Sequence, residues 1–230
     1  MKDDATIKLD QGGINARLLA REAKTDFRRV EAASRKIPTV VSSPEVKRLF
    51  VRFFNSMQLN MHFISVMART KLPHEVVEKI ENNLQEQIDK FTKTVNKAID
   101  GAEALCKANG IMSLASYDAE PLEMEVKVIS KFGRRYLELL GKIDQLMPML
   151  ETLAIEEVIE ITESELRKAQ FKKMVRQVAG AARNFKTGLQ RRMNSVTSEE
   201  QTKPEEKSPK SGITGVIVEA SDSLLVSMSN

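Results

Sequence analysis

The sequence predicts a mainly α-helical protein, a helical bundle that contains one short strand. Apolar residues spaced three or four positions apart recur along most of its 230 residues, which is the period of an amphipathic helix. The composition agrees: 7 prolines, 2 tyrosines and no tryptophan argue against an aromatic-rich β-sandwich, and residues that favour helices are abundant. A chain of this length can bury a substantial core.

The first part of the chain predicts two helices separated by a break. Residues 1–13 are polar, and we expect them to form a flexible arm. Residues 14–35 mix regularly spaced apolar side chains with many basic ones, which indicates an exposed amphipathic helix. Ser43 followed by Pro44 is a good start signal for the next helix. Residues 43–70 are apolar on nearly all sides, which is typical of a helix at the centre of a bundle.

The longest helical pattern in the chain comes next. Its apolar side chains, from Val77 to Leu105, form one continuous seam, and Gly110 is a natural C-terminal stop. The seam suits packing against residues 43–70 as a hairpin or against a second subunit, and periodicity does not choose between them. We take residues 14–110 as one helical region with a long helical hairpin.

Residues 122–129 alternate between apolar and polar side chains, which is the period of a strand. Val126 and Val128 fall on one side, and Lys127 falls on the other. This is the only convincing strand in the part of the chain that we expect to be ordered. Ser130 follows it as a candidate N-cap for a helix.

Two helices follow the strand. The first has an apolar stripe that includes Tyr136 and Ile143, and Pro148 should kink or end it. The second opens with the capping box Thr162-Glu163-Ser164-Glu165 and carries many more basic than acidic residues. Residues 194–230 are rich in Ser, Thr, Glu, Lys and Pro, which is the composition of a disordered tail.

The strand needs a partner, because a lone strand leaves its backbone groups unpaired. Either the apolar island 213–218 or the same strand of another subunit could supply it. A strand, a capped helix and a second helix follow one another in ribbon–helix–helix proteins, where two subunits share a two-stranded ribbon that enters the major groove. We therefore expect residues 111–193 to form a strand–helix–helix DNA-binding core in a homodimer. An edge strand with basic neighbours on its solvent side is the simpler alternative.

The candidate contacts to double-stranded DNA are basic residues beside the strand and in the two helices after it. Lys127 would face the bases, and cations at the start of a helix, together with its free backbone amides, can hold phosphates. The basic face of the last helix could instead balance the acidic segment 151–165. The candidate residues are Lys127, Lys131, Arg134, Arg135, Arg167, Lys168 and Lys172.

Nothing in the sequence indicates an enzyme. His62 falls in a buried-looking helix and His74 at a helix start, so neither is a convincing catalytic base. No glycine-rich phosphate-binding motif is present. The single Cys106 excludes an intramolecular disulfide framework and a four-thiolate zinc site. We expect no catalytic residue, metal, cofactor or small-molecule substrate.

The chain reads as a cytoplasmic protein, associated with the nucleoid or with a plasmid. Its start is too polar for a secretory signal, and no window of about 18 residues is free of polar side chains, so we expect no membrane partner. The net charge of +4 permits a nucleic-acid partner without requiring one.

Three segments and the basic last helix form a recognisable pattern. The segments are Tyr117-Asp118-Ala119-Glu120-Pro121-Leu122, Phe132-Gly133-Arg134-Arg135-Tyr136-Leu137 and Asp144-Gln145-Leu146. In these, roughly over residues 115–193, the chain resembles the AcaB family of regulators encoded on conjugative plasmids and integrative conjugative elements. The resemblance implies a DNA-binding transcription regulator that activates transfer genes and has a ribbon–helix–helix-like core.

Two other functions remain open from the sequence. One is a helical scaffold of the conjugation machinery that binds only protein, which would not be retained on DNA at moderate salt. The other is a nucleoid-type protein that binds DNA without sequence preference, which would not distinguish a promoter from random duplex.

Overall fold

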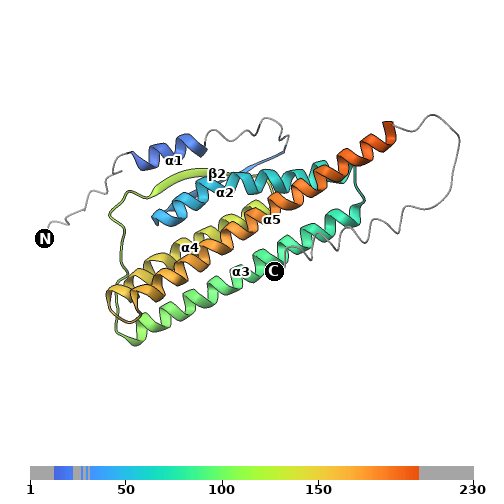
Figure 1. Cartoon of the computed structure of the whole chain (residues 1–230). Coiled ribbons are helices and arrows are strands. Elements are labelled where there is room, and N and C mark those ends of the chain that lie inside the picture. The colour runs from blue at the N-terminus through green and yellow to red at the C-terminus, as the bar shows by residue number, and fades with distance from the viewer. Residues whose placement is uncertain (1–12, 23–26, 28–29, 31, 202–230) are drawn as a thin grey trace.

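A computed structural model describes residues 13–22, 27, 30 and 32–201 of the chain. It shows long helices lying side by side, with a two-stranded sheet along one flank, so the mainly helical prediction is confirmed (Figure 1). Residues 1–12, the tail beyond residue 201 and its apolar island 213–218 lie outside the described residues. The elements are α1 (Ile14–Glu22), β1 (Arg35–Val41), α2 (Pro44–His62), η1 (Phe63–Met67), η2 (Ala68–Thr70), α3 (His74–Ala108), β2 (Leu122–Val128), α4 (Lys131–Ile155) and α5 (Ile161–Gln201).

The two strands of the sheet come from the same chain. Strand β1 pairs with β2 in an antiparallel register that sets Arg35 opposite Val128 and Val41 opposite Leu122. The expectation that β2 takes its partner from a second subunit is therefore wrong, because β1 of the same chain is its partner. The alternative partner, residues 213–218, lies outside the described residues. The expected helix over residues 14–35 is shorter, because α1 ends at Glu22 and Arg35 already belongs to a strand.

Pro38 fits into β1 because its missing N–H falls outside the ladder of hydrogen bonds. The carbonyl of Lys127 and the N–H of Ile129 both bond to the side-chain amide of Gln58 on α2, on the edge of β2 away from β1. Residues two apart in a strand direct their backbone groups to the same side, so Glu125 also points its groups away from β1. Pro38 lies opposite Glu125, at a pair that exchanges no backbone hydrogen bonds.

One face of the sheet packs on the helical core and the other faces outward. Leu122, Val126 and Val128 of β2 and Val41 of β1 are buried, while Lys127 is exposed. The alternation that the sequence shows therefore predicts the two faces of β2 correctly. Because the period of a strand is two residues, this register is held by the burial of one face.

The core is built from α2, α4 and α5, with α3 packed on α4. Helix α2 lies against α5 and α4, and α3 makes its main contact with α4 (Figure 1). Residues 43–70 and the long seam after them therefore do not form the expected hairpin. The rings of Phe50 and Phe54 stack with centroids 4.9 Å apart, and Phe54 lies 6.4 Å from Tyr136 of α4. The aromatic face of α2 thus packs on α4, and the seam of α3 packs on another side of α4.

The helix ends follow the local signals in some cases and depart from them in others. Ser130 caps α4 by accepting a hydrogen bond from the N–H of Gly133 at 3.1 Å. Ser43 precedes α2 as expected, but its hydroxyl and N–H both donate to the carboxylate of Asp144 on α4. Helix α4 continues through Pro148, and α5 continues past residue 193, where the composition changes, to Gln201. No helix in the described part of the chain is long and apolar enough to cross a membrane.

Gly133 is required where α4 passes the Gln58 side chain. A Cβ built at Gly133 would lie 2.4 Å from Gln58 Oε1. Gln58 is buried, and both the nitrogen and the oxygen of its side-chain amide are hydrogen-bonded to the backbone of residues 127 and 129. We expect Gly133→Ala to lower the free energy of unfolding by roughly 1–3 kcal/mol, since overpacking forces this amide off β2. Urea denaturation measures this change in the free energy of unfolding. The matched control is Gly141→Ala in the same helix, where a Cβ meets nothing within 4 Å, and stability there should stay equal or rise.

Candidate nucleic-acid interface

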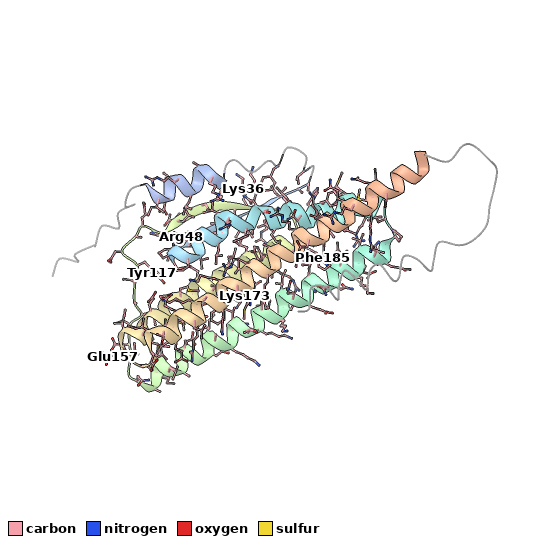
Figure 2. All side chains as sticks on the ribbon, in the orientation of Figure 1. Lys36, Arg48, Tyr117, Glu157, Lys173 and Phe185 are labelled. Carbon is pink, nitrogen blue, oxygen red and sulfur yellow. The ribbon has the colours of Figure 1, made fainter. Side chains whose placement is uncertain are left out.

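The outward side of the sheet is a small open surface with a basic residue on each strand. Lys36 of β1, which is labelled in Figure 2, lies directly opposite Lys127 of β2. Both residues are exposed. We call this surface the ribbon face. It consists of Lys36, Pro38 and Val40 from β1 and Glu123, Glu125 and Lys127 from β2.

The lysines of the ribbon face are not held by buried ion pairs, so they can bind a ligand. The Lys36 Nζ lies 3.2 Å from Glu125 Oε2, with both side chains more than 60% exposed (62% and 65%), so the pair is solvated and contributes little to stability. Lys127 has no ion-pair partner among the residues that the structure describes. A ligand that approaches this face meets two lysines that no buried interaction holds in place.

The start of α4 lies at one end of the ribbon face. Only Ile129 and Ser130 separate β2 from the first residue of α4, so the N-terminal amides of α4 lie close to Lys127. Lys131 is exposed, with its ammonium 5.0 Å from the centre of the Phe132 ring. Arg134 is half exposed and lies 3.6 Å from Glu138 one turn along. The positive end of the helix dipole and these cations favour an anion here.

Arg135 points to a different part of the molecule. Its guanidinium forms an ion pair with Asp89 on α3, and so it joins α4 to α3 rather than facing the ribbon. The basic residues expected at the start of α4 are thereby divided: Lys131 and Arg134 stay on the surface, and Arg135 has a structural partner.

The three candidates on the last helix lie apart from the ribbon face, on α5. Arg167 pairs with Glu163 one turn before it, and Lys172 is partly buried. Lys168 is only 2% exposed and donates hydrogen bonds to Glu151 of α4 and to Glu165. Because its charge is neutralised inside the protein, Lys168 is not on a surface that DNA could reach.

The acid–base properties of this cluster agree with its geometry. Burial alone lowers the pKa of Lys168, but the hydrogen bonds to Glu151 and Glu165 outweigh it and hold the pKa above its ordinary value. The same hydrogen bond from Lys168 lowers the pKa of Glu165. Lys168 therefore stays charged and acts as a clamp between α4 and α5.

Lys36 is the residue of the ribbon face that the sequence interpretation missed. The signal was present, because Ile37, Thr39, Val40 and Val41 are β-branched, which favours a strand. Pro38 masks this signal, since proline inside a run argues against a strand unless the strand lies at an edge. Within the described residues, no group of three or more His, Cys, Asp or Glu side chains could hold a metal ion.

Arg134 and Arg135 are adjacent in sequence but should respond differently to truncation. Arg135→Ala removes a solvent-accessible ion pair with Asp89, so the free energy of unfolding should fall by up to about 1 kcal/mol. Its DNA affinity should keep the wild-type salt dependence. Arg134→Ala should leave stability within about 0.5 kcal/mol and make the logarithmic salt slope shallower by about one unit. Urea denaturation and fluorescence anisotropy at several salt concentrations measure the two effects, and the reverse assignment would contradict the geometry.

The fold of this chain has a match among solved structures. The crystal structure of AcaB from uropathogenic E. coli superimposes with a TM-score of 0.67, over 83% of this chain and 97% of that chain, at 20% sequence identity. No protein-family model matches the sequence, and no curated protein is similar to it in sequence. The resemblance to AcaB is thus confirmed at the level of the fold.

Proposed function

We propose that this protein is a DNA-binding transcription regulator that reads duplex DNA with its ribbon face. The observation that carries the proposal is a two-stranded antiparallel ribbon with one face on the core and the other open, where Lys36 and Lys127 lie opposite each other. A ribbon of two strands fits the major groove of B-DNA, which is about 12 Å wide.

The residues around the ribbon divide into two roles. Lys36 and Lys127 are placed to reach base edges, where a lysine hydrogen-bonds the O6 and N7 acceptors of guanine. Glu125 can accept a hydrogen bond from a cytosine amino group once its solvated pair with Lys36 opens. Lys131 and Arg134, at the start of α4, contact phosphates and fix the position of the ribbon along the groove.

The regulatory part of the proposal rests on the likeness to AcaB. The shared fold and the sequence segments that resemble that family support an activator of transfer genes on conjugative elements. We propose that it acts as a homodimer, since paired half-sites suit a two-fold symmetric protein. Because β2 pairs inside its own chain, each subunit brings a complete ribbon, and the contact between subunits lies elsewhere.

Selection of duplexes from a random library on the immobilised full-length protein tests this function. A sequence-specific regulator should enrich a defined site that competes at least about 1,000-fold better than scrambled duplex. Retention of DNA without enrichment would support the nucleoid-type alternative. No retention at moderate salt would support a scaffold that binds only protein and would contradict the proposal.

A further inference from the structure

The exposed side of α5 carries positive charge without any acid. No aspartate or glutamate occurs from residue 166 to residue 198. Four exposed cations in this region lie three, seven and eight residues apart, which places them on one side of the helix. We call them the α5 stripe: Lys173, Arg176, Arg183 and Arg191. Figure 2 labels Lys173 on the exposed part of α5.

The cations of the α5 stripe have no carboxylate partner among the described residues. Arg134 and Arg135, by contrast, each have one carboxylate partner, and Lys168 has two. The hydrogen bond of Arg176 goes to the carbonyl of Lys172, which leaves its charge uncompensated. Like charges on one helix face repel one another, so this arrangement costs stability in the free protein and is relieved by a polyanion.

A groove runs beside the α5 stripe, between α5 and α3, with a volume of about 520 Å³. Side-chain amides line both walls: Gln177 and Asn184 from α5 and Gln87 from α3. The charged residues in the α3 wall, Glu86 and Lys90, balance each other. Amides, arginines and lysines are the side chains that contact the phosphates and sugars of DNA.

We propose that the α5 stripe and this groove bind the phosphate backbone of a second stretch of duplex DNA, apart from the one that the ribbon reads. The proposal rests on the proposed function. Helix α2 bonds to the sheet through Gln58 and packs against α5, so it separates the ribbon face from the α5 stripe (Figure 1). The two surfaces therefore contact different parts of the DNA, as when one duplex bends around the protein or two segments are held together.

Duplex DNA fits the α5 stripe better than single-stranded nucleic acid does. Binding of single strands relies on exposed aromatic rings on which the bases stack. The aromatic residues of α5 are Phe171 and Phe185, and they are only 5% and 1% exposed. From Lys173 to Arg191 the helix rises about 27 Å, at 1.5 Å per residue, which is most of one turn of B-DNA.

A negative charge introduced at Gly180 tests the proposal without disturbing the fold. Gly180 lies in the middle of the α5 stripe, and a Cβ there meets nothing within 4 Å, so Gly180→Glu fits and replaces a poor helix former. The matched control is Gly101→Glu on α3, where the glycine is also helical and a Cβ also meets nothing within 4 Å; Gly101 is exposed and Gly180 is half-buried. Both variants change the net charge by the same amount.

The measurement is affinity for scrambled duplex by fluorescence anisotropy over a range of salt concentrations. Gly180→Glu should bind at least about 5-fold more weakly than wild type and show a salt slope shallower by about one unit, whereas Gly101→Glu should match wild type. Arg176→Ala and Arg183→Ala should each lower the slope by about one unit.

The outcomes separate this proposal from the proposed function. If Gly180→Glu matches wild type while Lys127→Ala loses affinity for the selected site, the α5 proposal is overturned and the proposed function stands. If wild type binds no duplex at all, both fail. If wild type binds poly-glutamate and scrambled duplex equally well at the same ionic strength, the α5 stripe is a surface for acidic polypeptides and the α5 proposal is overturned.

Discussion

Tyr136→Asp is expected to abolish the folded state. Tyr136 has no exposed surface, its ring stacks near Phe54, and its hydroxyl donates a 2.9 Å hydrogen bond to the carbonyl of Val175 on α5. Burial raises the pKa of this hydroxyl above its ordinary value, so it keeps the proton that it donates. An aspartate there leaves a cavity and an unpaired buried charge, which together cost at least about 4 kcal/mol.

Circular dichroism and a thermal melt measure this loss. Ile143→Asp should behave in the same way, since Ile143 is also fully buried on α4. The control Tyr136→Phe keeps the ring and removes only the hydroxyl, so it should cost about 1 kcal/mol. Wild-type melting temperatures for both aspartate variants would show that the apolar stripe of α4 is assigned wrongly.

An engineered disulfide between the two strands is expected to have the second largest effect. Val40 and Glu123 are exposed and lie opposite each other, at a pair that exchanges no backbone hydrogen bonds. Such pairs have Cα atoms about 4.5 Å apart, within the range that a disulfide spans. The double variant Val40→Cys and Glu123→Cys closes a loop of roughly 80 residues. The chain-entropy model predicts that this disulfide raises the free energy of unfolding by about 4.5 kcal/mol.

Two readouts check the cross-link. Oxidised protein should migrate as a monomer in a non-reducing gel, and its urea midpoint should fall when a reductant is added. Cys106 is the natural cysteine and is buried, so the single variants Val40→Cys and Glu123→Cys are the controls for stray oxidation. Covalent dimers formed only by the double variant would show that the ribbon is shared between subunits.

Local signals in the sequence are enough to predict most single elements. The long seam of α3, the alternation of β2 and the Ser130 cap of α4 each depend on residues close together in the chain. The stop after α3 is of the same kind, since Gly110 takes a φ of +68° that other residues rarely adopt. These elements need no knowledge of the rest of the fold.

The pairing of the elements could not be read in the same way. β1 and β2 are joined by backbone hydrogen bonds between segments more than eighty residues apart, and backbone groups carry no sequence signal. The choice of α4 as the partner of α3 depends on which faces are already covered, because α2 uses its aromatic face on α4. Periodicity identifies an apolar face but not its partner.

In the candidate site, too, the features that depend on neighbouring residues could be predicted, and those that depend on distant residues could not. Lys127 lies on the ribbon face as the alternation predicts, and the start of α4 brings Lys131 and Arg134 beside it. The sequence predicts Lys168 to be a surface cation, but in the structure it is buried and pairs with Glu151 of α4, which is distant in sequence. A basic residue in an amphipathic pattern can be buried when a carboxylate of another element pairs with it inside the protein. Sequence spacing does not show which carboxylates lie within reach.

The central claim is that the ribbon face reads DNA, and the most direct measurement is the affinity of Lys127→Ala for the selected site and for scrambled duplex. If Lys127 contacts base edges, the loss should be about 1–3 kcal/mol on the selected site and much smaller on scrambled duplex. The control is Lys107→Ala, an exposed lysine at the end of α3, which should bind both duplexes like wild type. Equal binding of Lys127→Ala and wild type to both duplexes would contradict the claim.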